Sequence, residues 1–194
     1  MLMPTTKILV VNPNTTASMT DTIAAAARAA AAPGTEISAV TSPMGPASIE
    51  GFYDEAFAVP GLIQALLNAP DADAGIIACF DDTGLDAARS VAPFPVVGVC
   101  EAALVTAGQL ARRIAVVTTL PRSIVPLEEL VRRYGFADRA SVTACNVAVL
   151  DPARSRNSRP RSRWRWTRAR RPSSLVARAW PILRFRFRGN SAFP

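Results

Sequence analysis

The amino-acid sequence predicts an α/β fold built on parallel sheets. Short apolar runs alternate with longer helical segments along residues 7–147. Each apolar run is nearly continuous, which is typical of strands that are buried on both faces of a parallel sheet. Polar clusters follow three of these runs directly. Because ligands gather beyond the carboxyl ends of parallel strands, we expect the functional groups to meet at that edge.

Six segments are predicted as strands because valine, isoleucine, alanine and threonine dominate them. In order, these are Lys7–Val11, Glu36–Thr41, Ala74–Ala78, Val96–Val99, Arg113–Thr118 and Ser141–Val147. The first strand leads into the turn sequence Asn12-Pro13-Asn14. The second is followed by a long loop over residues 42–53, which contains two prolines and two glycines.

Five intervening segments are predicted as helices. In order, these are Ala17–Ala32, Glu55–Asn68, Leu85–Ser90, Glu101–Ala111 and Ile124–Tyr134. Thr15 or Thr16 is expected to cap the first helix, which Pro33-Gly34 stops. Thr83-Gly84 is expected to begin the third. Pro93 to Pro95 is a suitable joint between two lobes.

The composition excludes several kinds of site. The chain has no histidine, and Lys7 is its single lysine. Ser-His-Asp and Cys-His catalysis and histidine metal sites are therefore ruled out, and a Schiff-base lysine has little scope. An enzyme with this composition has to use a thiol, carboxylates and backbone dipoles.

Cysteine usage and hydropathy predict a cytoplasmic protein. The three cysteines lack C-x-x-C spacing, and their odd number argues against a disulfide framework. The apolar run Ile8–Val11 is too short for a signal peptide. No apolar run approaches the length of a membrane span, since Arg28 interrupts the longest alanine-rich stretch.

Charge divides the chain in two. All 15 acidic residues lie at or before Asp151, whereas residues 152–194 hold 13 arginines, all three tryptophans and no acid. This tail has neither helical nor strand periodicity, so we expect it to be irregular. One interpretation is a basic extension that binds nucleic acid or acidic surfaces through arginine and tryptophan.

Cys79 is the best-placed candidate nucleophile. It lies where a predicted strand ends and precedes a helix whose N-terminal dipole would favour a thiolate. The alternative is a buried structural cysteine, which is common. Cys100 and Cys145, at the end of one strand and within another, are expected in the core.

Polar neighbours of the strand ends also allow two interpretations. Asp81 and Asp82 either accept substrate N–H groups or cap the helix, and capping is the simpler role for one of them. Asn12 and Asn14 either form an Asx turn or, with the following threonines, bind an anionic or carbonyl ligand.

Four segments resemble the aspartate/glutamate/hydantoin racemase family. They are Ile8-Leu-Val-Val-Asn-Pro-Asn-Thr-Thr16, Ala78-Cys-Phe-Asp-Asp-Thr-Gly84, Pro95-Val-Val-Gly-Val-Cys-Glu-Ala-Ala103 and Val116-Val-Thr-Thr119. The sequence Cys-Phe-Asp-Asp after the third predicted strand is similar to the corresponding segment in the hydantoin and allantoin racemase branch of this family. The resemblance implies two similar α/β lobes with parallel sheets flanked by helices and the site at their interface. Residues 1–93 would form the first lobe, with Cys79, and residues 94–151 would begin the second.

The resemblance also implies an isomerase that uses neither cofactor nor metal. Two thiols, one from each lobe, would flank the α-carbon of a hydantoin or another amino-acid derivative, and Cys79 would be the first. The implied substrate-binding residues are Asn14, Thr15, Phe80, Asp81, Asp82, Thr118 and Thr119. Members of the family are often homo-oligomers, and neither a membrane nor a specific nucleic acid is expected as a partner.

The family's second thiol segment, of the type Gly-Cys-Ala-Gly-Met-Ala-Asp-Leu, is missing. However, the codons can be regrouped so that each new codon joins the third base of one codon to the first two bases of the next. In this reading the Trp180–Pro181 junction can encode only alanine, and the neighbouring junctions are compatible with the rest of the segment in the right order. The Trp166–Thr167 junction likewise forces aspartate. We therefore expect residues from about 154 onward to be a frameshifted reading of a racemase C-terminus, which leaves the second lobe incomplete and racemisation impaired.

Two alternatives to a two-thiol racemase stay open. One is a single-thiol decarboxylase or cis–trans isomerase of the same superfamily type. The other is a binding module that works through the basic tail.

Overall fold

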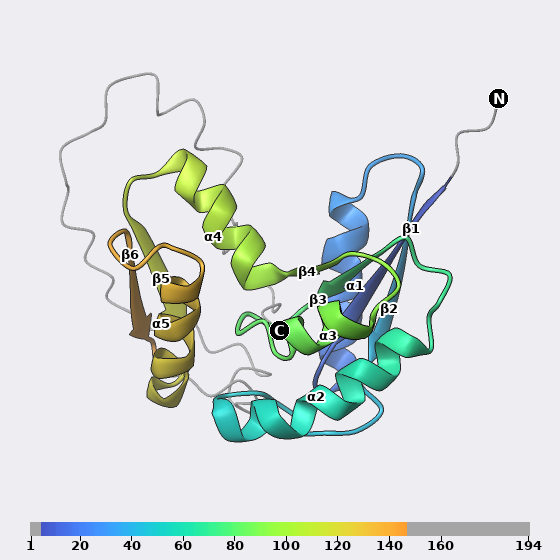
Figure 1. Cartoon of the computed structure of the whole chain (residues 1–194), viewed down its shortest axis with the longest axis horizontal. Helices are drawn as coiled ribbons and strands as arrows, with labels where there is room; N and C mark the ends of the chain where they lie inside the picture. The colour runs from blue at the N-terminus through green and yellow to red at the C-terminus, as the bar shows by residue number, and fades with distance from the viewer. Residues whose placement is uncertain (1–4, 147–194) are drawn as a thin grey trace, which may run out of the picture. The chain divides into compact units, whose positions relative to one another are not determined.

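The computed structural model describes residues 5–146, whose first part is a four-stranded parallel sheet (Figure 1). Its strands, in the order β2-β1-β3-β4, are β1 (Thr6–Asn12), β2 (Thr35–Thr41), β3 (Ala74–Ile77) and β4 (Val96–Gly98). The helices that connect them are α1 (Ala17–Ala30), α2 (Phe52–Leu67) and α3 (Leu85–Val91). The predicted α/β fold with parallel sheets is confirmed.

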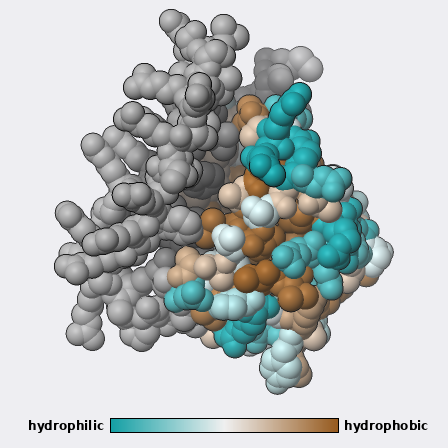
Figure 2. All heavy atoms as spheres, turned by 90° about the vertical axis from the view of Figure 1, so that its left-hand side faces the viewer, coloured by the Kyte–Doolittle hydropathy of each residue, from teal (hydrophilic) through white to brown (hydrophobic). Residues whose placement is uncertain are grey.

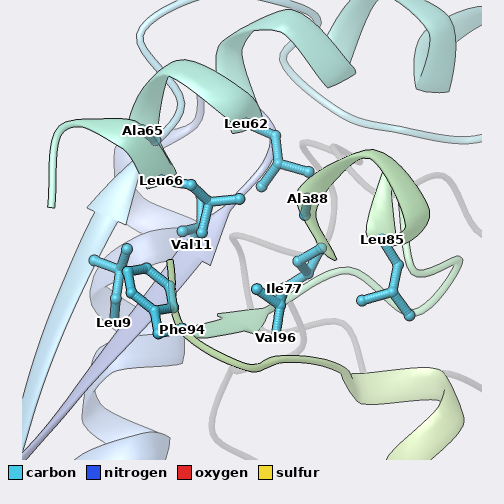
Figure 3. Close-up of a cluster of buried hydrophobic side chains, with 10 residues drawn as sticks. All are labelled: Leu9, Val11, Leu62, Ala65, Leu66, Ile77, Leu85, Ala88, Phe94 and Val96. Carbon is cyan, nitrogen blue, oxygen red and sulfur yellow. The ribbon is translucent and has the colours of Figure 1, made fainter. Parts of the chain in front are cut away.

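Side chains that alternate along β1 divide between the two faces of this sheet. Leu9 and Val11 pack with the fully buried Leu62 and Leu66 of α2 (Figure 3). Ile77 of β3, Phe94 and Val96 complete this core. Asn12, whose side chain bonds to α1, lies on the opposite face. The sheet is thus covered by helices on both faces, as parallel sheets require.

A second, two-stranded parallel sheet pairs β5 (Ile114–Thr118) with β6 (Ala140–Ala144). Around it lie α4 (Val99–Leu110), a 3₁₀ turn (Pro121–Ser123) and α5 (Ile124–Arg133). Its core contains Cys100, Leu104, Val116, Leu127, Leu130 and Val131. The other face of the sheet, with Ala115, Val117, Ser141 and Thr143, is exposed. Figure 2 shows hydrophobic side chains reaching the surface on this side of the described chain.

The boundary between the two sheets falls later than predicted. β4 lies beyond residue 93, yet it pairs with β3 through Gly75–Val96, Ile76–Val97 and Ile77–Gly98. The first sheet therefore extends to Gly98, and the second core begins at Cys100. Pro93 to Pro95 is a connection within the first sheet, because the strand that follows returns to it.

Element ends also differ from prediction by a few residues. Helix α2 begins at Phe52, inside the predicted loop, and α4 begins at Val99. Cys100 therefore lies in the first turn of a helix and not at the end of a strand. Cys145 is half-buried and follows β6 instead of lying within it. The predicted irregular tail, residues 152–194, lies outside the described residues.

Helices within residues 5–146 are all too short or too polar to cross a membrane.

Candidate active site

The loop that carries Cys79 lies beside the loop that follows β1. Strands β1 and β3 are paired neighbours, and the Ala78 N–H extends their ladder by donating to the Val11 carbonyl at 2.9 Å. Two of the three polar clusters that were expected to meet, those after β1 and β3, thus lie at one edge of the first sheet. The third does not end a strand of that sheet: Thr118 is the last residue of β5 in the second sheet, and Thr119 follows it. Their carbonyls accept from the backbone N–H and the thiol of Cys145, respectively.

The loop after β1 is a buried amide network that begins helix α1. The side-chain nitrogen of Asn12 donates to Asn14 Oδ1 at 2.9 Å and to Thr20 Oγ1 at 3.0 Å. Asn14 Oδ1 also accepts from the Thr16 N–H at 2.9 Å. This is the Asx turn that the sequence allowed.

The threonines do not cap this helix with their hydroxyls. Thr16 occupies the N-cap position, but its hydroxyl donates to the Ala47 carbonyl at 2.7 Å. The Thr15 hydroxyl donates to the Pro46 carbonyl at 3.3 Å. The Asn14 side chain instead accepts from the N–H of Thr16, and both threonine hydroxyls bind the loop after β2.

The thiol loop is a tight turn from Cys79 to Gly84. The Asp82 N–H donates to the Cys79 carbonyl at 3.0 Å, and Asp82 has a positive φ of 48°. Within the turn, the fully buried Thr83 donates its hydroxyl and its backbone N–H to Asp81 Oδ1. Cys79 itself is half-buried, and Phe80 is exposed.

The environment of Cys79 favours the neutral thiol. Burial raises the pKa of Cys79 well above its usual value, and the negative charge of Asp81 and a hydrogen bond to its side chain raise it further. A hydrogen bond from the Thr83 side chain opposes this in part. The expectation that a helix dipole produces a thiolate was therefore wrong, because desolvation and the neighbouring carboxylate outweigh the two-turn helix α3.

Asp82 is bonded to the protein through both carboxylate oxygens. Oδ1 accepts from the Cys100 N–H at 2.8 Å, whereas Oδ2 accepts from the Glu101 N–H at 2.9 Å and the Tyr134 hydroxyl at 2.7 Å. Asp82 thus caps a helix, as the simpler interpretation had it. The helix is α4, however, and not the adjacent α3, which begins without a side-chain cap.

A cavity of about 170 Å³ lies next to this loop. It is lined by Phe52, Glu55, Asp81, Asp82, Gly84, Leu85, Asp86, Ala87, Pro126, Glu129, Leu130 and Arg133. Cys79 is not among these residues. The pKa of Glu55 is raised by burial and by the charge of Asp81, while Arg133 opposes the shift.

Three residues of this region were missed in the sequence. Thr83 had a local signal, since an Asp-x-Thr spacing favours an Asx turn. Glu55 and Tyr134 had none, because they reach the thiol loop from α2 and from the end of α5. In residues 5–146 no three metal-ligating side chains lie together in a way that could hold an ion.

Known proteins resemble this chain in sequence and in structure. It is 47% identical over 148 residues to the hydantoin racemase of Pseudomonas sp. (strain NS671), covering 75% of this chain and 59% of that protein. It is 46% identical over 156 residues to the hydantoin racemase of Rhizobium meliloti, covering 76% and 64%. The solved allantoin racemase from Klebsiella pneumoniae is 44% identical and superposes with a TM-score of 0.75, covering 79% and 63%.

In each of these comparisons the chain spans less than two thirds of the relative's own length. The family model described as Asp/Glu/Hydantoin racemase matches residues 8–171. The match includes both strand-end loops described above and continues into the arginine-rich segment. On these similarities, the chain belongs to the Asp/Glu/hydantoin racemase family.

Proposed function

We propose that this chain is an amino-acid-derivative racemase, similar to hydantoin racemases, in which Cys79 is one of two thiol bases. The observation that carries the proposal is the half-buried Cys79 thiol at the carboxyl end of β3, next to Asp81. The hydantoin and allantoin racemases that resemble the chain support the same substrate class.

A 5-substituted hydantoin suits such a site. Its α-carbon carries an acidic hydrogen because a carbonyl and the ring flank it, and hydrogen-bond donors stabilise the enolate that forms. One thiolate removes the proton and the opposite thiol delivers another to the other face, with no cofactor. As a neutral thiol, Cys79 is in the form that delivers a proton. Before it can remove one, it has to lose its own, and the Asp81 carboxylate is the adjacent acceptor.

The substrate-binding role of the surrounding residues is part of this proposal. Asn14, Thr15, Phe80 and Asp81 come from the two adjoining loops, and Thr118 and Thr119 from the end of β5. Asp82 was expected to share this role, but its three bonds to the protein favour a part in holding the loop.

We propose further that the second base is lost in the frameshifted tail. The racemase would then transfer protons at one face of the substrate only. The same proposal includes a cytoplasmic location and a reaction without a cofactor. It also includes weakened assembly into homo-oligomers, because the second lobe is incomplete.

The test is to incubate each enantiomer of a 5-substituted hydantoin with the 194-residue chain in D₂O. We expect deuterium to enter the α-position of one enantiomer without inversion, at a rate above that of buffer alone. Cys79→Ser should abolish the exchange, whereas Cys145→Ser should keep it. Rapid inversion by this chain would refute the missing base, and exchange unaffected by Cys79→Ser would refute Cys79 as the base.

A further inference from the structure

The Asp82 side chain connects the thiol loop to two elements that follow later in the chain, α4 and the end of α5. Its oxygens accept from two backbone N–H groups in the first turn of α4, those of Cys100 and Glu101, and from the hydroxyl of Tyr134, which directly follows α5. Asp82 is only 4% exposed. Its negative charge is therefore held almost entirely by these three donors.

The backbone of Asp82 shapes the turn that carries the thiol. Its N–H donates to the Cys79 carbonyl, and its own carbonyl accepts from the Leu85 N–H at 3.0 Å. Its positive φ is one that few residues other than glycine, asparagine and aspartate adopt. Because one residue closes the turn and carries the carboxylate, a shift of the carboxylate moves the turn that begins at Cys79.

Burial makes this arrangement sensitive to the loss of a single donor. Desolvation raises the pKa of Asp82, while the bonds from Cys100, Tyr134 and Glu101 oppose the shift. A buried carboxylate that loses a donor has to admit water or change position. Two of the donors lie at the start of a helix, where the dipole also favours an anion.

We propose that Asp82 and Tyr134 are a positioning pair, which fixes the conformation of the Cys79–Gly84 loop and so limits the access of water to the Cys79 thiol. The catalytic consequence rests on the proposed function, but the effect on the thiol does not. Neither residue needs to touch the substrate. Tyr134 acts through Asp82, and Asp82 acts through the turn.

Gly98 offers an independent way to disturb the same pair. A methyl group at this position would overlap the Cγ and both oxygens of Asp82. Only a hydrogen fits there, so Gly98→Ala has to displace the carboxylate. Gly51 is the matched control, because a methyl group there meets only the Arg122 carbonyl, at an ordinary 3.5 Å.

The first experiment measures alkylation of Cys79 by iodoacetamide against pH, followed by mass spectrometry of the Cys79 peptide. We expect Tyr134→Phe to raise the rate at pH 8 by about tenfold, the equivalent of one charge-assisted hydrogen bond, and to lower the midpoint of the pH profile. The rate rises because a looser loop hydrates the thiol. Tyr53→Phe is the control, since Tyr53 is the chain's other tyrosine and is 77% exposed.

The second experiment repeats the measurement with Gly98→Ala against Gly51→Ala. It includes Val10→Ala as a variant that is destabilised elsewhere, because Val10 is buried on the face of β1 opposite to the core against which Cys79 packs. A shifted midpoint in Tyr134→Phe and Gly98→Ala, absent from Val10→Ala, supports the positioning pair. Unchanged profiles in both variants, or the same shift in Val10→Ala, would overturn it.

Exchange of the hydantoin α-hydrogen is measured separately on the same proteins. If the wild-type chain catalyses no exchange, the proposed function fails, and the alkylation profiles still decide whether the pair positions the loop. If it does catalyse exchange, Tyr134→Phe should lower kcat more than it changes KM, since the pair does not bind the substrate.

Discussion

At the scale of single residues, burial keeps the Cys79 thiol neutral, and the surrounding carboxylates reinforce this effect. Asp81 faces Cys79 and raises the pKa of its thiol, and Asp82 holds the turn from the other side. Glu55 adds a third acid at the adjoining cavity. The loop thus keeps its cysteine protonated, in contrast to sites where cations favour the thiolate.

Replacing Asp81 with asparagine should make Cys79 more reactive. The change removes the negative charge that raises the pKa of the thiol and leaves only a neutral carbonyl oxygen as acceptor, which binds the thiol proton more weakly. We expect the pH midpoint of Cys79 alkylation to fall, with a rate at neutral pH that is higher by severalfold. Asp21→Asn, at an exposed position of α1, is the control. A midpoint that stays unchanged in Asp81→Asn would show that burial alone sets the pKa.

Glu55 should make the folded state less stable as the pH rises. Its pKa is raised in the folded protein, so the folded state binds the proton more tightly than the unfolded state does. The stability linked to that proton is fully present below the unfolded pKa and is lost as the pH rises through the folded pKa.

Glu55→Gln should remove this part of the pH dependence. We expect the variant to unfold at a higher temperature than the wild type at pH 7.5 and at a similar temperature at pH 4. Thermal unfolding followed by circular dichroism measures both. Parallel curves for the two proteins across this range would contradict the assignment.

At the scale of elements, α2 covers the face of the first sheet that carries Leu9 and Val11, and the main core lies between this helix and the sheet. Leu62 and Leu66 are fully buried on one side of this helix, while Leu67 is 54% exposed. The same helix brings Phe52 and Glu55 to the cavity beside the thiol loop. Its packing therefore supports both the core and the site.

Adjacent leucines of α2 should differ sharply in their contribution to stability. Leu66→Ala should lower the free energy of unfolding by about 2–5 kcal/mol, because it leaves a cavity in the core. Leu67→Ala should change it by no more than about 0.5 kcal/mol, since its side chain is largely in water. Urea denaturation checks the pair, and equal losses would contradict the assigned burial.

Most elements could be predicted from sequence because each strand is a short apolar run between strong turn signals. The meeting of the loops after β1 and β3 is predictable as well, because both follow such runs. The end of the first sheet is not, since β4 is only three residues long and directly precedes a helix. Periodicity cannot show which strand such a short segment pairs with.

The site was only partly predictable. Cys79 and Asp81 are neighbours in the sequence, so a single motif contains both. The bonds from Asp82 to Cys100 and Tyr134 join residues 18 and 52 positions apart. No local pattern encodes such contacts. The pKa of Cys79 was mispredicted because burial, which only the fold determines, has the larger effect.

At the scale of the whole molecule, the second sheet lacks a cover on one of its faces among the described residues. A parallel sheet normally has helices on both faces, yet Val117 of β5 is 52% exposed. In the frameshift hypothesis, the missing cover and the second thiol belong to the same lost segment. That hypothesis stays a prediction.

Restoring the reading frame should restore both the cover of the second sheet and the second thiol. Sequencing across codons 150–160 should find an insertion or deletion relative to the source genome. The corrected protein should invert a 5-substituted hydantoin at both faces and unfold at a higher temperature than the 194-residue chain. A gene sequence with an unbroken frame and no insertion or deletion relative to the source genome would refute the hypothesis. A corrected protein without the Gly-Cys-Ala-Gly-Met-Ala-Asp-Leu segment would refute it as well.

The left-handed backbone of Asp82 also limits how this position can evolve. Asparagine and glycine tolerate such a backbone but carry no negative charge, whereas glutamate keeps the charge and is rarely found with that conformation. Aspartate alone meets both demands. Natural variation at this position should therefore be narrow, and any accepted change should be accompanied by a compensating substitution at Tyr134 or Gly98.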